Sequence, residues 1–245
     1  MPSDMNSLPH SCETETEAPY SFMRKCPSLA RWVEFWCIDC AEESTCDPAD
    51  VLSKEEITRA QAYRSNADSR AFIRRRAALR ALIGRWLKCE PEAVRFSSNA
   101  YGKPLLAWPS TGEVLSFSVA HTTGIALLAI AQCESIGVDI ERVRHDLDFL
   151  CVGRVAFAES ELAWMTACDR NEMADRFFRL WTRKEAYLKA LGWGFLRDPR
   201  MFVPAAIDEE ARNDGVHATA PWVPKSGDLF ELPLGRLLRG AFAVG

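Results

Sequence analysis

Three short apolar segments follow one another in the middle of the chain and limit what it can fold into. They cover residues 115–120, 124–131 and 136–143. Their length and the turn residues between them are typical of strands joined by short connections. A helix with one apolar stripe is predicted before them, over 68–87, and a second long helix after them, over 172–191. Strands and helices gathered in separate runs indicate an α+β fold.

Further elements are predicted on both sides of this region. A strand is expected over 33–38, and Ser53 followed by Glu56 has the spacing of a capping box, which starts a helix. The tail after residue 200 is expected to form strands and loops. The remaining predicted elements are the strands 94–96 and 104–108 and the helix 159–167.

The chain is predicted to form two similar α+β lobes. It has 245 residues, of which 48% are hydrophobic, and this is enough for two lobes of roughly 100 to 120 residues each. Residues 240–244 and residues 124–128 both begin with glycine and continue with apolar side chains, and both segments follow a helix-rich stretch. The predicted organisation is a flexible leader over 1–28, an N-terminal lobe over 29–146 and a C-terminal lobe over 147–245.

Charge and hydropathy exclude several classes of protein. The 30 basic and 34 acidic side chains give a net charge of −4, which argues against a general nucleic-acid binder. No apolar run approaches the roughly 20 residues of a membrane span. Glu13, Glu15 and Glu17 stand where a signal peptide would be apolar. We therefore expect a cytoplasmic protein that binds neither nucleic acid nor membrane.

The cysteines leave one alternative open. There are nine, an odd number in a chain too long to need disulfides, so most are expected to be reduced. Cys37 and Cys40, with Cys46, could form a metal-binding or redox module. Two cysteines three apart on a strand point to opposite faces, however, and no second such pair or close histidine completes a zinc set.

The segment 136–142 carries the most informative polar residues. Side chains alternate along a strand, so Asp139 and Glu141 point to the same side while Val138 and Ile140 take the other, buried side. Two adjacent carboxylates repel each other unless a cation lies between them, and oxygen ligands on a strand suit Mg²⁺. The alternative is an ordinary strand with a solvated acidic face.

The second long helix adds a third carboxylate. Glu185 lies four residues after Trp181, at the edge of the aromatic side of the helix. Lys189, one turn later, could neutralise it in a simple intrahelical ion pair. The functional interpretation is that Glu185 completes a three-carboxylate metal site with the acidic strand, while Lys184 and Lys189 face phosphates bound by the same metal.

Two segments and one helix face could contact phosphate. Lys103 stands between a glycine and a proline in a stiff turn, and His121 ends a strand, although both features also occur without a ligand. Ten Lys or Arg against three Asp or Glu between residues 54 and 88 form a basic stripe. The run 74–76 is all arginine, and a helix cannot point all three the same way.

Taken in order, these segments resemble the Sfp-type 4′-phosphopantetheinyl transferase superfamily over roughly residues 33 to 195. The matching pieces are Tyr101-Gly102-Lys103-Pro104, Phe117-Ser118-Val119-Ala120-His121, Gly137-Val138-Asp139-Ile140-Glu141, Phe157 with Glu161, and Trp181-Thr182-Arg183-Lys184-Glu185-Ala186-Tyr187-Leu188-Lys189. The resemblance implies two pseudo-twofold-related α+β lobes with coenzyme A in the cleft between them. The combination of the acidic strand with the Trp-x-x-Lys-Glu-Ala helix is the specific part.

The resemblance also implies roles for individual residues. The metal ligands would be Asp139, Glu141 and Glu185. Coenzyme A or its phosphates would contact Lys103, Ser118, His121, Lys184 and Lys189. In many relatives a basic residue falls three positions after the aspartate that opens the second helix. Here that position is Ala71, and Arg70 or Arg74 is expected to replace it.

By the same resemblance, the chain is a Mg²⁺-dependent enzyme of the holo-acyl-carrier-protein synthase type. A serine of an apo acyl or peptidyl carrier protein would attack the β-phosphate of coenzyme A, and 3′,5′-ADP would leave. His121, Lys184 and Lys189 would absorb negative charge, and Glu185, or else Glu161, would accept the serine proton. A monomer is expected, with Arg64, Arg70 and the surroundings of Phe195 facing the carrier. A coenzyme A-binding protein without turnover is the alternative.

Overall fold

A computed structural model describes residues 23–25, 33–41, 48–109, 114–192, 198–201, 229–232, 234 and 237–244. The first half contains β1 (Met23–Lys25), β2 (Val33–Asp39), η1 (Pro48–Val51), α1 (Lys54–Gln61), α2 (Asn66–Leu87), η2 (Pro91–Ala93), β3 (Arg95–Ser98), β4 (Pro104–Trp108), β5 (Ser116–Thr122) and β6 (Ile125–Ala131). The second half contains β7 (Ile136–Arg142), α3 (Phe149–Ala156), α4 (Glu159–Thr166), α5 (Arg170–Leu191), η4 (Pro199–Met201), β8 (Leu229–Glu231) and β9 (Leu238–Val244). None of the described helices is long and apolar enough to cross a membrane.

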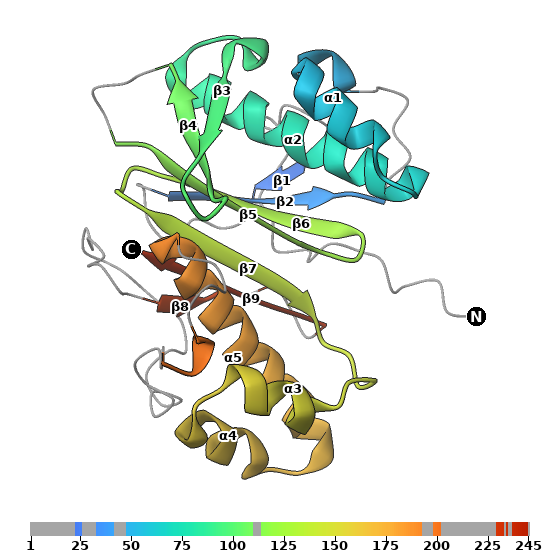
Figure 1. Ribbon diagram of the computed structural model, residues 1–245, viewed down its shortest axis with the longest axis vertical. Helices are drawn as coiled ribbons and strands as arrows, with labels where there is room; N and C mark the ends of the chain where they lie inside the picture. The colour runs from blue at the N-terminus through green and yellow to red at the C-terminus, as the bar shows by residue number, and fades with distance from the viewer. Residues whose placement is uncertain are drawn as a thin grey trace.

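The strands form two larger antiparallel sheets and a separate hairpin. One sheet has the order β1-β2-β6-β5 and the other the order β7-β9-β8, while β3 pairs with β4. Figure 1 shows the layers: α1 and α2 cover the outer face of the first sheet, and α5 lies on the second sheet with α3 and α4 beyond it. The predicted α+β class is confirmed.

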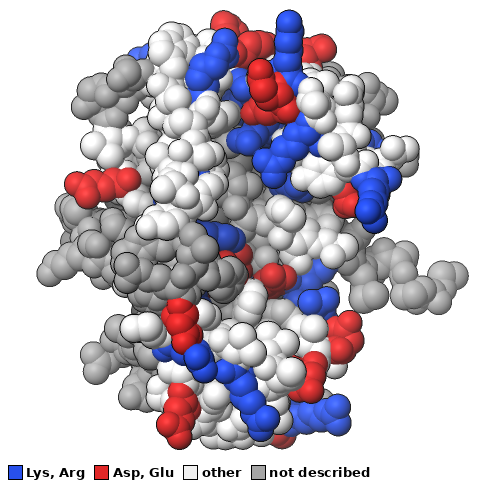
Figure 2. Space-filling view, in the orientation of Figure 1, with Lys and Arg blue, Asp and Glu red and all other residues white. Residues whose placement is uncertain are grey.

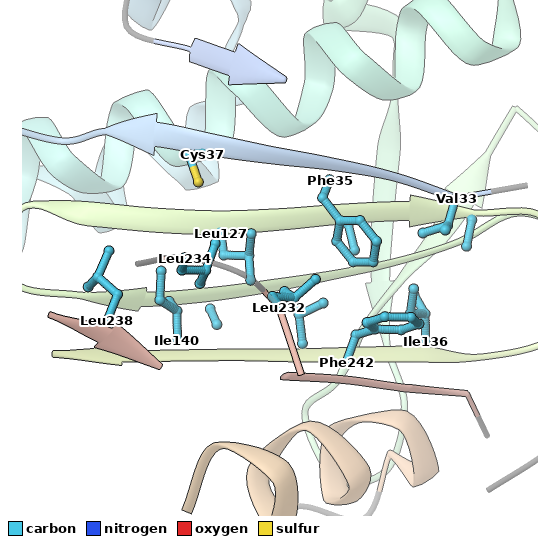
Figure 3. Packing of buried hydrophobic residues seen from close by; sticks show 14 of the residues in the cluster. Val33, Phe35, Cys37, Leu127, Ile136, Ile140, Leu232, Leu234, Leu238 and Phe242 are labelled. Carbon is cyan, nitrogen blue, oxygen red and sulfur yellow. The ribbon is translucent and has the colours of Figure 1, made fainter. Parts of the chain in front are cut away.

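A hydrophobic core lies between the two sheets. Figure 3 shows side chains from both sides meeting there, with Phe35 of β2 against Phe242 of β9 at 4.9 Å between ring centroids. Val138 and Ile140 of β7 are fully buried in the same cluster, as the alternation along the strand predicts. A second cluster packs α2 against the other face of the first sheet. The acidic strand is therefore anchored by one face and offers the other to α5.

Several local predictions are confirmed by the structure. Ser53 and Glu56 form the predicted capping box at the start of α1. The long helices α2 and α5 and the strands β5, β6 and β7 lie within two residues of their predicted bounds. Helix α3 was not predicted.

Two predicted boundaries differ from the observed strand pairing. Residues 23–25, inside the predicted flexible leader, form β1 and pair with β2. Strand β7 was assigned to the N-terminal lobe, but it pairs along its whole length with β9, so that Asp139 stands opposite Ala241. The pairing therefore joins the acidic strand to the C-terminal sheet. This membership depends on hydrogen bonds between residues far apart in the sequence, which local patterns do not predict.

Candidate active site

Helix α5 approaches strand β7 closely, and a glycine makes the approach possible. A Cβ on Gly137 would stand 2.0 Å from the carbonyl oxygen of Ala186 and 2.3 Å from the amide nitrogen of Ala190. No larger residue fits there without a shift of backbone. The approach brings the acidic side of β7 against Glu185 and Lys189 of α5.

Asp139 meets Lys189 at this contact. Nζ of Lys189 donates a hydrogen bond to Oδ1 of Asp139 at 2.6 Å. Burial raises the pKa of the Asp139 carboxyl, against the opposing effect of Lys189. Within the described ranges, Oδ2 of Asp139 is buried without a hydrogen-bond partner. Because Asp139 is only 5% exposed, the alternative of a solvated acidic face is wrong for this residue.

Two further carboxylates lie within electrostatic range of Asp139. Glu141 is half-buried and accepts a hydrogen bond from Oγ1 of Thr122 at 3.2 Å, and burial and then Asp139 raise its pKa. Burial raises the pKa of Glu185 to about 7; Lys189 opposes this shift, and Asp139 and Glu141 add to it. The three carboxylates singled out in the sequence thus influence one another electrostatically from β7 and α5.

This set of donors fits a hard divalent cation. All three are carboxylates, which Mg²⁺ prefers, and a buried oxygen without a partner is costly unless something binds it. Across the described residues, no three His, Cys, Asp or Glu side chains already stand close enough to hold a metal ion. Lys189 occupies one oxygen of Asp139 instead.

The raised pKa of Glu185 predicts that the metal-free protein becomes less stable as the pH rises. In the folded state Glu185 keeps its proton up to about pH 7, whereas the unfolded chain releases it above the ordinary pKa of 4.5. Folded protein therefore binds more protons in this window, and the free energy of unfolding falls as the pH rises from 4.5 to 7. Urea unfolding with a chelator at pH 5 and pH 7 should show this trend, and Glu185→Gln should weaken it. An unchanged pH dependence in the variant would contradict the burial of Glu185.

His121 extends the site toward α2. Partial burial, then Arg75 and Lys189, lower the pKa of its imidazole, and Asp68 opposes them. The strand end of β5, the middle of α2 and the last turns of α5 therefore share one electrostatic environment. Arg75 was missing from the predicted site residues. The sequence shows three consecutive arginines. Which of them faces β5 depends on the rotation of α2 about its own axis where it packs on the sheet.

The two arginines proposed from the sequence, Arg74 and Arg70, have different surroundings. Arg74 is 5% exposed, and its Nη1 donates to the carbonyl oxygen of Asp39 at 3.4 Å. This contact ties α2 to β2, and the binding of coenzyme A by Arg74 stays a prediction. Arg70 is exposed in the second turn of α2.

Lys184 and Glu161 form a buried ion pair with each other. The two side chains are 3% and 1% exposed, and Nζ of Lys184 donates to Oε2 of Glu161 at 2.5 Å and to the carbonyl oxygen of Pro199 at 3.0 Å. The same carboxylate oxygen accepts from the amide of Ala158. The pairing gives both side chains a structural role, while the phosphate contact of Lys184 and the base role of Glu161 stay predictions. The pair joins α5 to α4 and η4.

Ser118 and Lys103 are also engaged within the protein. The Ser118 hydroxyl is buried and accepts a hydrogen bond from the amide of Val138 at 3.0 Å, which ties β5 to β7. Nζ of Lys103 donates to oxygens of Ser135, Ile136 and Ala190. Both side chains connect structural elements, and their contacts with coenzyme A stay predictions.

The cysteine alternative gains no support from the structure. Cys37 is fully buried in the core and Cys40 is half-buried at the end of β2. Cys46 lies outside the described residues. Where the chain is described, no metal-binding group includes a cysteine.

A cavity of about 760 Å³ lies between α1, α2 and the β3–β4 hairpin. Figure 2 shows the basic side chains over α1 and α2 around a hollow on this face. The cavity lining includes Arg59, Arg76, Arg95 and Phe96. The guanidinium of Arg76 lies 4.8 Å from the centroid of the Phe96 ring, so cations and an aromatic face line the same space.

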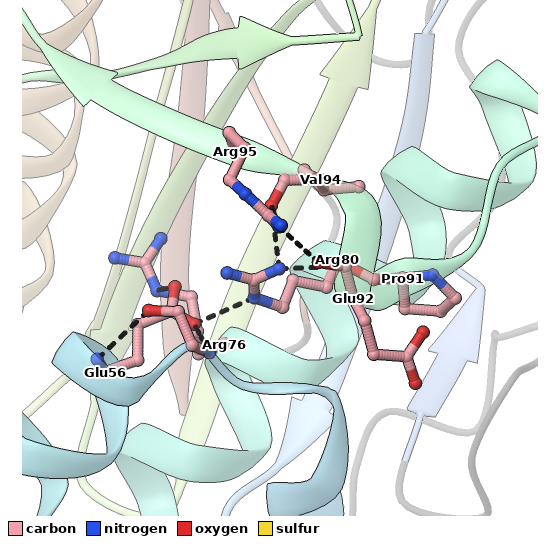
Figure 4. A network of polar contacts seen from close by, with 8 residues as sticks. Glu56, Arg76, Arg80, Pro91, Glu92, Val94 and Arg95 are labelled. Atoms are coloured by element: carbon pink, nitrogen blue, oxygen red, sulfur yellow. Dashed lines mark hydrogen bonds and ion pairs between the residues drawn. The ribbon is translucent and has the colours of Figure 1, made fainter.

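A buried polar network supports the cavity wall. Glu56 pairs with Arg80 at 2.8 Å and with Arg76 at 2.9 Å (Figure 4). Arg80 also donates to the carbonyl oxygens of Pro91 and Val94 at 3.0 and 2.8 Å. This network locks α1, α2 and η2 together, and it leaves Arg59 and Arg95 as exposed cations on the cavity lining.

Comparison with known proteins shows similarity to one family. The family model described as the 4′-phosphopantetheinyl transferase superfamily matches residues 135–220. The 4′-phosphopantetheinyl transferase HetI of Nostoc sp. is 33% identical over 186 residues, which cover 75% of this chain and 78% of HetI. The transferase Sfp of Bacillus subtilis is 26% identical over 143 residues, which cover 58% of this chain and 61% of Sfp. The chain therefore belongs to the 4′-phosphopantetheinyl transferase superfamily.

Proposed function

We propose that the protein transfers the 4′-phosphopantetheine group of coenzyme A to a serine of an apo carrier protein. The proposal is supported by the electrostatic coupling of Asp139, Glu141 and Glu185 beside Lys189, in a chain of this family. The acidic groups provide a metal site, and the neighbouring cations provide contacts for phosphate.

A Mg²⁺ ion held by Asp139, Glu141 and Glu185 would supply positive charge to the pyrophosphate of coenzyme A. The protein itself adds cations on the other side. Lys189 is half-exposed and within hydrogen-bond range of the site, and Arg75 and His121 share its electrostatic environment. These groups bind and orient the pyrophosphate and neutralise charge on the transferring phosphoryl group.

The serine hydroxyl attacks the β-phosphorus, a new oxygen–phosphorus bond forms, and the bond to the bridging oxygen of the pyrophosphate breaks. 3′,5′-ADP leaves with that oxygen. Glu185 is the proposed acceptor of the serine proton, because it lies beside Lys189 and the other two carboxylates of the site. Glu185 is also one turn away from Lys189 on the same helix face, which keeps base and phosphate contact together.

The cavity of about 760 Å³ is the proposed site of the 3′-phosphoadenosine part of coenzyme A. It offers an aromatic face at Phe96 and exposed guanidinium groups at Arg59 and Arg95. Its lining includes Pro104, so it continues to the Tyr-Gly-Lys-Pro turn. The size and the charge match an adenosine with one phosphate ester better than an apolar ligand.

Arg59→Ala is expected to raise the Michaelis constant for coenzyme A about tenfold while leaving that for 3′-dephospho-coenzyme A unchanged, because one charge-assisted contact to phosphate is lost. Both constants are measured with the same carrier protein. Arg70→Ala is the matched variant, since Arg70 is exposed on α2 but does not line the cavity. If Arg70→Ala shows the selective loss and Arg59→Ala does not, the phosphate lies outside this cavity.

The transfer itself is tested by incubating the protein with coenzyme A, Mg²⁺ and apo carrier proteins of fatty-acid, polyketide and nonribosomal-peptide pathways. Intact mass should show an increment of about 340 Da on at least one carrier, the mass of the transferred arm. Arg64 and Arg70 are exposed near the start of α2 and are proposed to face the carrier, while Phe195 lies outside the described residues. No increment on any carrier would overturn the proposed function.

A further inference from the structure

The β3–β4 hairpin ends in a rigid tip that touches both elements of the acidic site. Asn99 organises the tip: its Oδ1 accepts from the amides of Tyr101 and Lys103, each at 2.9 Å. The amide of Gly102 donates to the carbonyl oxygen of Asn99 at 3.1 Å, with Gly102 at a φ of +84°. Such a closed turn presents Lys103 from a fixed position at the end of the β3–β4 hairpin. Figure 1 shows the hairpin itself.

This tip caps the C-terminal end of α5. Nδ2 of Asn99 donates to the carbonyl oxygen of Gly192 at 2.9 Å, and Nζ of Lys103 donates to that of Ala190 at 3.1 Å. The last carbonyls of a helix lack partners within the helix, and they favour a positive charge. A Cβ on Gly192 would stand 2.9 Å from Nδ2 of Asn99, so the helix ends in a residue that lets the tip approach.

The same ammonium group also binds the start of β7. Nζ of Lys103 donates to Oγ of Ser135 at 2.6 Å and to the carbonyl oxygen of Ile136 at 3.2 Å. Oγ of Ser135 in turn donates to the carbonyl oxygen of Ala190. The three N–H donors of the Lys103 ammonium are thus matched by three oxygens of the described residues. One oxygen lies on the β6–β7 connection, one on β7 and one on α5.

These contacts stand directly beside the site. Ile136 is three residues before Asp139 on β7, and Ala190 follows Lys189 on α5. We infer that Lys103 is a positioning residue, which fixes how far along β7 helix α5 sits and thereby holds Glu185 against Asp139 and Glu141. This inference rests on the proposed function of the three carboxylates.

Lys103→Met tests the inference, since methionine keeps most of the apolar stem and removes the ammonium. The affinity of the protein for Mn²⁺, measured without coenzyme A from the electron paramagnetic resonance signal of the free ion, is expected to fall roughly tenfold, because a misplacement of about 1 Å is costly for a preorganised site. kcat should fall by a similar factor, and the Michaelis constant for coenzyme A should change by less than about twofold.

Three further variants keep the test decisive. Asn99→Ala loosens the same tip without removing a charge and should lower Mn²⁺ affinity in the same direction. Lys103→Arg keeps the charge and should restore part of the loss. Lys88→Met, at an exposed lysine outside this cluster, should change nothing. Circular dichroism and melting temperature establish that each variant is folded.

Two results would overturn the inference. One is wild-type Mn²⁺ affinity in folded Lys103→Met. The other is a loss confined to the Michaelis constant for coenzyme A, which would make Lys103 a substrate contact. A failure of the proposed function looks different, because the wild-type protein itself would then neither bind Mn²⁺ nor modify a carrier.

Discussion

We expect Asp139→Asn to lower the rate of carrier modification by roughly a thousandfold, because the proposed metal site loses a ligand that would contribute several kcal/mol to stabilising the transition state. Asparagine keeps the size of the side chain but removes the charge that pairs with Lys189. The initial rate is measured by intact mass of the carrier at fixed Mg²⁺ and saturating coenzyme A. Glu185→Gln should cause a loss of the same order.

The matched control for these variants is Glu172→Gln. Glu172 is an exposed carboxylate on the same helix as Glu185, and it pairs with Arg176 far from the site. Its replacement should leave the rate within about twofold, since exposed ion pairs contribute little. If folded Asp139→Asn modifies the carrier at the wild-type rate, the three-carboxylate site is not where the reaction takes place.

Lys184→Met should destabilise the protein by about 3–5 kcal/mol, since it leaves Glu161 buried without its partner. Adding Glu161→Gln to the same chain should recover part of the loss, because the unpaired charge is then gone. Urea unfolding at pH 7 measures both effects. Arg200→Ala is the control: it breaks the exposed pair with Asp198 and should leave the stability nearly unchanged.

The same experiment separates the structural role of Lys184 from the role first expected of it. If Lys184 contacts a phosphate of coenzyme A, folded Lys184→Met protein will show a raised Michaelis constant and nearly normal stability. The ion pair with Glu161 predicts the reverse, with a Michaelis constant that changes by less than about twofold.

Short-range periodicity was enough to predict the acidic half of the site. Alternation along β7 predicts that Asp139 and Glu141 share a face, and the structure also has Val138 and Ile140 in the core. Helical geometry could also have separated the two lysines of α5. Lys189 is one turn beyond Glu185 and shares its face, whereas Lys184 is adjacent to Glu185 in sequence and must point elsewhere.

The remaining differences depend on contacts between distant parts of the chain. Lys103 donates a hydrogen bond to the carbonyl oxygen of Ala190, 87 residues later, and no sequence pattern around Lys103 predicts that partner. The hydroxyl of Ser118 accepts a hydrogen bond from the amide of Val138, 20 residues away in another sheet. The choice of Arg75 over Arg74 follows from how α2 packs. Such pairings are decided by tertiary structure, and a motif that gives the residue type does not give its partner.

The pairing of β7 with β9 has a consequence for how the enzyme becomes active. Asp139 sits on a strand whose neighbour, 238–244, is synthesised long after it and contributes no carboxylate to the site. When all three carboxylates of the proposed site have been synthesised, the strand that β7 needs as its neighbour is therefore still missing, and the site cannot yet be complete. A substitution that breaks the pairing of β9 with β7 is therefore expected to impair the chemistry without touching any residue that performs it.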